Sequence, residues 1–145
     1  MEVLALAMVV LAADRFTKLL ITEMFSLGES VPVAENVLHW TFVMNRGAAF
    51  GMLEGSRWLF ITVAVAVLCA GFYFREDILK QDWLTQVGVA CFGAGAMGNL
   101  IDRTLFGGVI DFIDFRIWPV FNVADMAVCF GVACILGSVV WRQES

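Results

Sequence analysis

Four long apolar stretches constrain this chain most strongly, because each is long enough to cross a lipid bilayer. A hydrocarbon core about 30 Å thick requires roughly 20 apolar residues in a helix that rises about 1.5 Å per residue. The stretches cover residues 3–21, 58–74, 83–101 and 121–141. The chain is 61% hydrophobic and 16% charged, whereas soluble domains are about 25% charged. We therefore predict an all-α integral membrane protein with four transmembrane helices, in which residues 1–145 form a single domain.

The segments between the helices predict a small β-sheet and a short helix. Residues 31–33, 37–43 and 109–117 are rich in β-branched and aromatic residues, as strands are. With four spans, these segments lie on one side of the membrane, where they can pair and satisfy their backbone groups. Residues 45–53 form a weakly amphipathic stretch of small residues, which predicts a short interfacial helix.

Charge and cysteine content exclude several classes of function. The net charge is −5 and no basic stripe is present, so we expect no nucleic-acid partner. The four cysteines lie in apolar stretches without metal-binding or redox spacing, and they are interpreted as small buried hydrophobic residues. Neither a metal nor a cofactor is predicted.

Two aspartates in the last third of the chain lie where a membrane-embedded chain should avoid charge. Asp111 interrupts the apolar run 109–113, and Asp125 lies at the beginning of the last apolar stretch. An ionisable residue at membrane depth is costly, and it indicates a functional site. If the fold brings them close together, the two carboxyl groups indicate acid–base chemistry at a membrane surface.

Asn122 and Asp125 also have the spacing of a helix capping box, which is a purely structural alternative. The same position at a helix N-terminus favours the carboxylate form of Asp125. The capping role and a catalytic role therefore both remain open for this residue at this point.

The environment of Asp111 depends on whether residues 109–117 are extended. In a strand, Asp111 has only apolar neighbours on its face, so desolvation is expected to raise its pKa. Asp114 then shares the other face with Arg116, as an ordinary surface ion pair. In a helix, Asp111 and Asp114 would instead share one face. A strand here therefore predicts one aspartate with a raised pKa and one with a lowered pKa, which is the pattern of an acid–base pair.

Polar residues within two of the apolar stretches follow helical spacing. Asp14 and Lys18 lie four residues apart and can form an ion pair, which either makes both tolerable in lipid or braces a site; we favour bracing. Asn99 and Arg103 share a face with Gly95, and helix packing explains the glycine but not a buried amide. Asp102, beside Arg103 near the helix end, is expected to form a surface charge pair.

Five short motifs occur in order along the chain. They are Asp14-Arg15-Phe16-Thr17-Lys18, Asn45-Arg46-Gly47-Ala48-Ala49-Phe50-Gly51, Gly98-Asn99-Leu100-Ile101-Asp102-Arg103, Val109-Ile110-Asp111-Phe112 and Phe121-Asn122-Val123-Ala124-Asp125. In this order on four apolar stretches, they make the chain similar to the lipoprotein signal peptidases (signal peptidase II), an aspartic peptidase family of the bacterial inner membrane.

The resemblance implies an endopeptidase that cleaves prolipoproteins on the amino side of a diacylglyceryl-modified cysteine. The catalytic pair of that family falls on Asp111 and Asp125, which would use water and no cofactor. Supporting polar positions fall on Asp14, Lys18, Asn45, Asn99, Arg103 and Asn122. We include Arg46 and Gly95 in the predicted site as well.

The resemblance also implies a placement in the cell. It puts both termini in the cytoplasm, the sheet and the surface helix in the periplasm, and the active site at the outer leaflet. The expected partners are prolipoprotein substrates and membrane lipids, and we expect a monomer. One departure from the family is the interval between Asp111 and Asp125, which is shorter than in many members.

Two other classes of protein are compatible with part of the pattern. An ion- or proton-coupled transporter would also bury Asp14, Asp111 and Asp125, but transporters usually contain repeats and broken helices near the midplane. A structural scaffold would explain the small residues at 93–98, but not the arrangement of carboxyl groups.

Overall fold

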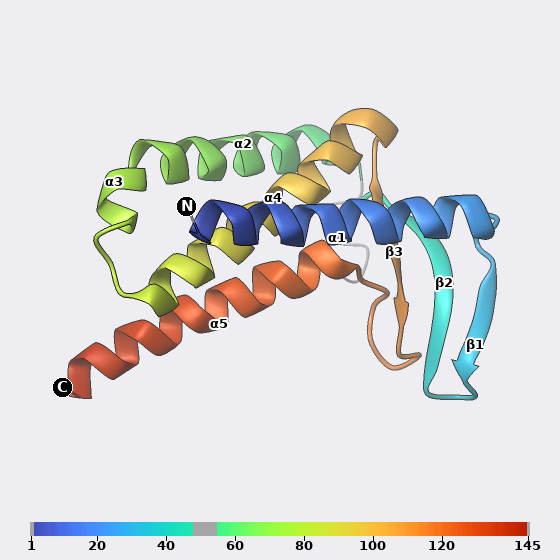
Figure 1. Cartoon of the computed structure of the whole chain (residues 1–145). Helices are drawn as coiled ribbons and strands as arrows, with labels where there is room; N and C mark the ends of the chain where they lie inside the picture. Colours follow the sequence, from blue (N-terminus) through green and yellow to red (C-terminus); the bar gives the residue numbers. More distant parts are fainter. Residues whose placement is uncertain (1, 48–54, 145) are drawn as a thin grey trace.

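Helices dominate this computed structural model, which describes residues 2–47 and 55–144 (Figure 1). The long helices are α1 (Glu2–Met24), α2 (Arg57–Tyr73), α4 (Trp83–Phe106) and α5 (Val123–Glu144). They coincide with the four apolar stretches of the sequence. A short helix, α3 (Arg75–Ile78), lies between α2 and α4.

Helix α4 is the centre of the bundle and contacts α1, α2 and α5. Both ends of the chain lie at the ends of their helices that point away from the sheet (Figure 1). Glycines allow the close approach of α4 and α5. A Cβ atom at Gly95 would lie 2.3 Å from the carbonyl oxygen of Ala124, so a larger residue there would force the two helices apart.

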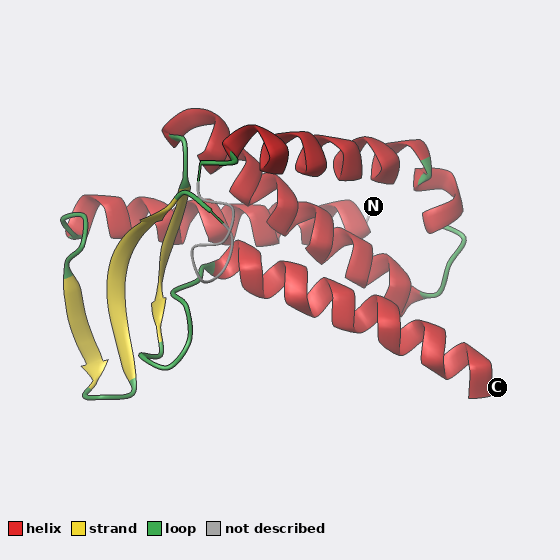
Figure 2. Ribbon diagram, turned by 180° about the vertical axis from the view of Figure 1, so that it is seen from behind, coloured by secondary structure: helices red, strands yellow, loops and turns green. Residues whose placement is uncertain are grey.

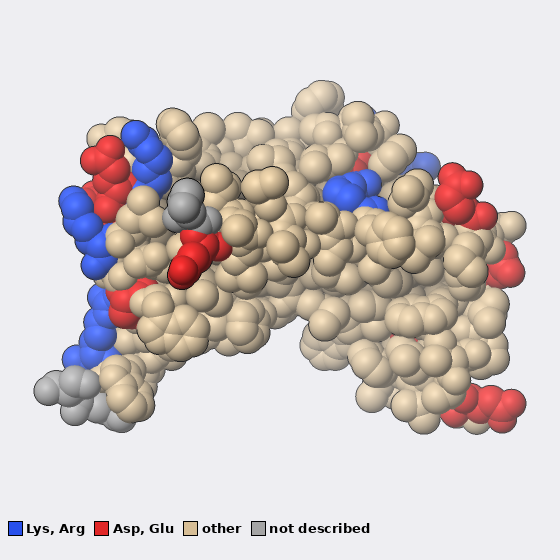
Figure 3. Space-filling model, in the orientation of Figure 1, with Lys and Arg blue, Asp and Glu red and all other residues tan. Residues whose placement is uncertain are grey.

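The distribution of polar and apolar side chains is the reverse of that in a water-soluble protein. The largest fully buried side chains are all polar: Lys18, Asn122, Asp14, Asp102 and Asp111. Large apolar side chains are exposed along all four long helices, including Met8, Val63, Met97 and Phe130. On the face shown in Figure 3, charged residues gather mainly toward the two ends of the molecule, and the surface between them is mostly uncharged.

Length and composition support membrane crossing most clearly for two helices. Within the described residues, α4 and α5 are long and apolar enough to cross a membrane. Helix α2 is a shorter apolar helix of 17 residues. Helix α1 is 23 residues long, and its buried residues include the charged pair Asp14 and Lys18.

A three-stranded antiparallel sheet lies at one end of the bundle, with strand order β1-β2-β3. The strands are β1 (Ser30–Ala34), β2 (Leu38–Asn45) and β3 (Val109–Asp114). The prediction that the two interhelical segments pair with each other is therefore confirmed. The strands run across the direction of the helices (Figure 2). A cluster of Ile21, Phe42, Ile110 and Phe112 packs the end of α1 against the sheet.

Three predicted boundaries were wrong. The last strand was expected to continue to residue 117, but it ends at Asp114, because the Asp114 carboxylate accepts a hydrogen bond from the backbone N–H of Arg116 and turns the chain. Helix α4 continues to Phe106 and ends at Gly107, whose φ of 79° stops the helix. The predicted interfacial helix was to begin at Asn45, which instead belongs to β2; residues 48–54 of that prediction lie outside the described part of the chain.

Candidate active site

The first turn of α5 is closed by a reciprocal cap, as the sequence predicted. The backbone N–H of Asp125 donates to Oδ1 of Asn122 at 2.9 Å, and the backbone N–H of Asn122 donates to Oδ2 of Asp125 at 3.2 Å. Capping accounts for one carboxylate oxygen of Asp125. The other, Oδ1, accepts a hydrogen bond of 2.7 Å from Nδ2 of Asn99 on α4.

Asp111 lies on β3 and is 1% exposed. Its partners are neutral amides: Nδ2 of Asn122 lies 2.6 Å from Oδ1, and Nδ2 of Asn45 lies 2.9 Å from Oδ2. Burial and the negative charge of Asp125 raise the pKa of Asp111 to about 7, against the opposing effect of the two amides. Asp111 therefore holds a proton at a pH where an exposed aspartate has lost it.

Asn122 and Asn99 connect the two carboxyl groups. Asn122 donates from Nδ2 to Asp111 and accepts from the backbone of Asp125, so it contacts both aspartates directly. Its Nδ2 also lies 3.1 Å from Oδ1 of Asn99, which in turn donates to Asp125. Asn122 is fully buried and Asn99 is 8% exposed, so this chain of amides is shielded from solvent.

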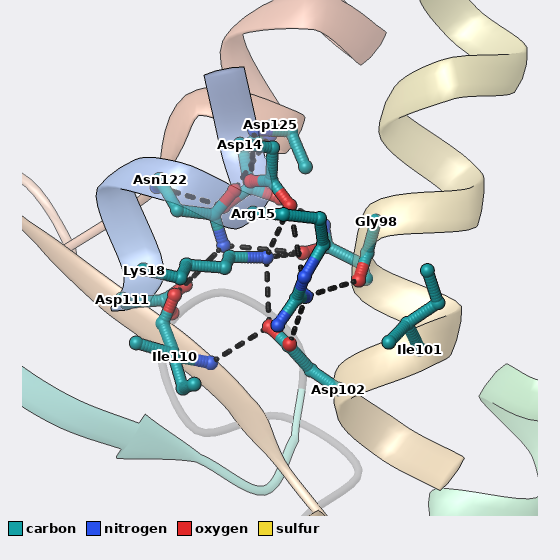
Figure 4. A network of polar contacts seen from close by, with 12 residues as sticks. Asp14, Arg15, Lys18, Gly98, Ile101, Asp102, Ile110, Asp111, Asn122 and Asp125 are labelled. Atoms are coloured by element: carbon teal, nitrogen blue, oxygen red, sulfur yellow. Dashed lines mark hydrogen bonds and ion pairs between the residues drawn. The ribbon is translucent and has the colours of Figure 1, made fainter. Parts of the chain in front are cut away.

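Beneath the amides lies a group of buried charges centred on Lys18 (Figure 4). The Lys18 ammonium group donates to Oδ1 of Asn99 at 3.0 Å and lies 3.1 Å from Asp14 and 2.7 Å from Asp102. The predicted ion pair between Asp14 and Lys18 is thus confirmed. Asp14 also accepts a hydrogen bond of 3.0 Å from the backbone N–H of Ala124, beside Asp125.

Asp102 contradicts the prediction of a surface charge pair with Arg103. Its side chain is fully buried and pairs with Lys18 and with Arg15 on α1. It also accepts a hydrogen bond of 3.2 Å from the backbone N–H of Ile110, the residue before Asp111. The prediction was wrong because Asp102 lies on the side of α4 that packs against α1 and β3, and not on a side that faces solvent.

Both aspartates line one cavity of about 490 Å³. Arg103 lines it too, with its guanidinium carbon 4.7 Å from the centre of the Phe60 ring on α2 and its charge interacting with Asp125 and Asp111. The cavity has a polar floor and mostly apolar walls. Its lining residues are Asn45, Gly47, Phe60, Arg103, Val109, Asp111, Trp118, Pro119, Val120, Phe121, Asp125, Met126 and Cys129.

Two residues of the predicted site lie apart from the carboxyl groups. Gly95 packs against Ala124 and Val128 at the crossing of α4 and α5, so its contacts are those of helix packing. Arg46 follows β2 and is exposed. Among the described residues, 2–47 and 55–144, no group of three or more His, Cys, Asp or Glu side chains is arranged to hold a metal ion.

Comparison with known proteins identifies the family of this chain. The family model for Signal peptidase (SPase) II matches residues 6–141. A lipoprotein signal peptidase of Desulfitobacterium hafniense is 46% identical over 130 residues, which cover 88% of this chain and 85% of the relative. A lipoprotein signal peptidase of Halothermothrix orenii is 42% identical over 139 residues, covering 94% of this chain and 93% of the relative. The chain belongs to the signal peptidase II family.

Solved structures extend the likeness to the fold. Two of them, both described as bacterial membrane enzymes, are each 34% identical to this chain. The first has a TM-score of 0.91 and covers 98% of this chain and 89% of its own. The second has a TM-score of 0.86 and covers 95% and 92%, respectively. As a member of the signal peptidase II family, the protein is a membrane protease, a hydrolase of peptide bonds in the bacterial cell membrane.

Sequence reasoning omitted two residues that the structure brings into this signal peptidase II site. Arg15 donates to the carboxylate of Asp102 and to the carbonyl of Gly98 at 3.3 Å, and Asp102 holds the beginning of β3. The sequence contained a signal for both residues, because Arg15 and Asp102 lie within two of the five family motifs. What was missing was the packing of α4 against α1 and β3, which determines the surroundings of Asp102.

Proposed function

We propose that this protein is an aspartic endopeptidase that removes signal peptides from prolipoproteins. It would cleave on the amino side of a cysteine that carries a diacylglyceryl group. The observation that carries the proposal is the pair of carboxyl groups on one cavity, Asp111 and Asp125, which are connected through Asn122. Curated relatives named lipoprotein signal peptidase support the choice of substrate.

The chemistry assigned to the pair is hydrolysis by water. In the free enzyme Asp111 carries the shared proton, since its pKa is raised to about 7, and Asp125 is the base. Asp125 removes a proton from water as the oxygen attacks the scissile carbonyl carbon, while Asp111 donates its proton to the carbonyl oxygen. Protonated Asp125 then gives its proton to the leaving nitrogen while the Asp111 carboxylate takes a proton from one hydroxyl of the tetrahedral diol. The C–N bond breaks, and the pair returns to its starting protonation state.

The amides and Arg103 have a supporting role in this proposal. Asn45, Asn99 and Asn122 hold the two carboxyl groups by hydrogen bonds of 2.6–2.9 Å. Arg103 places a positive charge on the same cavity, where it balances the negative charge of the pair. Such fixed dipoles and charges stabilise the developing oxyanion without reorganising during the reaction.

We further propose that all four long helices cross the bilayer. The exposed apolar side chains along α1 and α2 support this, as do aromatic residues at helix ends: Trp58 and Tyr73 on α2, Trp83 on α4 and Trp141 on α5. Aromatic residues favour the membrane–water interface. In this placement the termini are cytoplasmic, the sheet is periplasmic, and the cavity lies at the outer leaflet.

Substrate would enter the cavity sideways from the lipid. Helices α2 and α5 both pack on α4, and each contributes wall residues, Phe60 from α2 and Met126 and Cys129 from α5. The acyl chains remain among lipids and contribute binding, since each buried methylene contributes about 0.8 kcal/mol.

The decisive experiment is cleavage of a synthetic prolipoprotein peptide by the purified protein in detergent. The lipidated peptide should be cut between the residue that precedes the modified cysteine and that cysteine. The same peptide without its diacylglyceryl group should be cut far more slowly, mainly through a higher KM. Equal efficiency on both peptides would contradict lipid-dependent entry, and no cleavage of either would contradict the proposed function.

A further inference from the structure

The connection between β3 and α5 exposes the most solvent-accessible large apolar side chain in the described part of the chain. Ile117 is 93% exposed, and its neighbours Trp118 and Phe115 are 61% and 41% exposed. We call residues 115–118 the apolar turn. Exposed apolar side chains on the long helices are explained by lipid around the bundle, but Ile117 is in a loop at the sheet end of the molecule.

The backbone conformation of the apolar turn is fixed by hydrogen bonds. Arg116 has a φ of 66°, which is uncommon for a residue other than glycine. Asp114 holds it there, accepting hydrogen bonds from the Arg116 backbone N–H at 2.8 Å and from its guanidinium group at 3.1 Å. Asp114 is itself 5% exposed and is fixed by the Thr41 hydroxyl at 2.9 Å. Strain of this kind persists where the surroundings impose it, and it is concentrated at functional positions.

Contacts between the residues before and after the apolar turn also hold its two ends together. Phe121 exchanges backbone hydrogen bonds with Ile113, at 2.8 and 3.1 Å, and its ring stacks on Phe115 with the centres 5.9 Å apart. Residues 118–121 at the same time line the cavity that contains Asp111 and Asp125. The turn is therefore a preformed projection next to the mouth of the candidate active site.

The position of the turn in the molecule points to its partner. The sheet projects sideways from the end of the helices, and β3 is the strand nearest to them (Figure 1). The connection from β3 to α5 runs on the side of this projection that faces α5, whereas the projection carries acidic side chains at its far tip in Figure 3. With the helices placed across a bilayer, the side that faces α5 meets the lipid surface.

We propose that the apolar turn inserts into the phospholipid surface beside the cavity. Ile117 and Trp118 enter the acyl boundary, and the half-exposed guanidinium group of Arg116 binds lipid phosphate. The insertion holds the cavity mouth at the depth of the lipid headgroups. This inference rests on the proposed bilayer placement of the helices and not on the assignment of the catalytic pair.

The test uses spin labels on the full chain in vesicles of phosphatidylcholine with and without phosphatidylglycerol. Single cysteines replace Ile117, Val37 and Phe130 in a background without the four native cysteines. Val37 is an exposed apolar residue in the β1–β2 connection, and Phe130 is an exposed apolar residue on α5. Accessibility to molecular oxygen, which dissolves in lipid, is compared with accessibility to a water-soluble nickel chelate.

The label at Ile117 is expected to resemble the label at Phe130, and the label at Val37 to show access to the chelate. If Ile117 matches Val37 while Phe130 remains in lipid, insertion of the turn is refuted but the helix placement stands. If Phe130 is also accessible to the chelate, the placement itself fails. Protection at Ile117 that appears only with added substrate, or only at high protein density, would assign the turn to the substrate or to a second copy, and would overturn the proposal.

Variants in the native-cysteine background provide a second measurement if the cysteine-free protein does not fold. Arg116→Gly keeps the positive φ but removes the guanidinium group, whereas Arg116→Lys keeps a positive charge. Cleavage in vesicles with phosphatidylglycerol should show a severalfold higher KM for Arg116→Gly than for Arg116→Lys, with kcat unchanged. Ile117→Asp should raise KM in the same way, whereas Val37→Asp should not. Equal KM values for all four variants would refute the proposal.

Discussion

Asp82 and Asp125 each take part in the cap of a helix, at opposite ends of the α4–α5 pair. Asp82 caps the beginning of α4, where its Oδ1 accepts from the backbone N–H of Thr85 at 3.0 Å. Asp125 lies in the first turn of α5 and accepts from the backbone of Asn122. Each aspartate also contacts the neighbouring helix, Asp82 through Ser138 and Arg142 and Asp125 through Asn99.

The two ends differ in the groups that surround each carboxylate. Hydrogen bonds from Arg142 and Ser138 lower the pKa of Asp82, so it is a permanent anion in an ion pair on the molecular surface. At the other end, hydrogen bonds to Asp111 and Asp125 come from asparagine amides and backbone, and the negative charge of Asp125 raises the pKa of Asp111 in addition to burial. A capping aspartate thus becomes a candidate for acid–base chemistry when a second carboxyl group, neutral partners and a cavity accompany it.

The largest expected difference is between substitutions of the pair and of Asp82. Asp111→Asn and Asp125→Asn should each lower kcat by roughly 10²–10⁴-fold or more, because each removes the proton donor or the acceptor. Cleavage of the lipidated peptide in detergent measures the effect. Asp82→Asn should retain kcat, and so should Asp114→Asn, which lies on the same strand as Asp111 but outside the cavity. Near-normal cleavage by either variant of the pair would refute the assignment.

Lys18→Met should give the largest loss of stability. The substitution leaves Asp14 and Asp102 as buried carboxylates without their shared cation. Removing one partner of a buried ion pair costs about 3–5 kcal/mol. Thermal unfolding in detergent should show a large decrease in Tm, together with a loss of activity. Lys80→Met is the matched control, because Lys80 and Asp77 form an exposed pair whose loss should change Tm little. Equal changes in Tm would contradict the importance of the buried group.

The pH dependence should follow the proton on Asp111. If one shared proton is needed, kcat/KM should fall as the pH rises through about 7, where Asp111 loses it. Asn45 donates to Asp111 and lowers its pKa, so Asn45→Ala should move this limb of the profile to higher pH. A limb that moves to lower pH, or does not move, would contradict the assignment.

The same pKa has a consequence for stability. Because the pKa of Asp111 is higher in the folded protein than its ordinary value of 3.8, its stabilising contribution is complete below about pH 3.8 and is lost as the pH rises through about 7. Asp111→Asn should therefore have a Tm at pH 8 equal to or above that of the unchanged protein. A lower Tm would indicate that the variant damages the fold.

The smallest effect is expected at the end away from the sheet. Asp82→Asn and Arg142→Gln should each lower Tm by a few degrees, because they remove an exposed contact between α4 and α5. Neither should change kcat or KM. A loss of cleavage by these variants without a change in Tm would show that the two ends are coupled. Asp82 would then not be a purely structural aspartate.

The sequence determined the parts of this protein that depend on local pattern. The long apolar stretches located all four long helices, and runs of β-branched and aromatic residues located the strands. The spacing of Asn122 and Asp125 predicted their reciprocal cap, and that of Asp14 and Lys18 predicted their ion pair. These contacts join residues three or four positions apart, so helix geometry alone brings them together.

Tertiary structure decided the contacts between residues far apart in the chain. Asp102 contacts Lys18 and the backbone of Ile110 because its side of α4 packs against α1 and β3, and no local rule predicts that packing. Packing against Ala124 accounts for the contacts of Gly95, and hydrogen bonds from Arg116 to Asp114 fix the turn in which Ile117 is exposed. The pKa of Asp111 depends on burial by several elements and on Asp125, a residue of another element. Spacing identified the residues, but only the packed helices and sheet determined which of them share a hydrogen bond, an ion pair or a cavity, because burial and electrostatic interaction depend on distances in space.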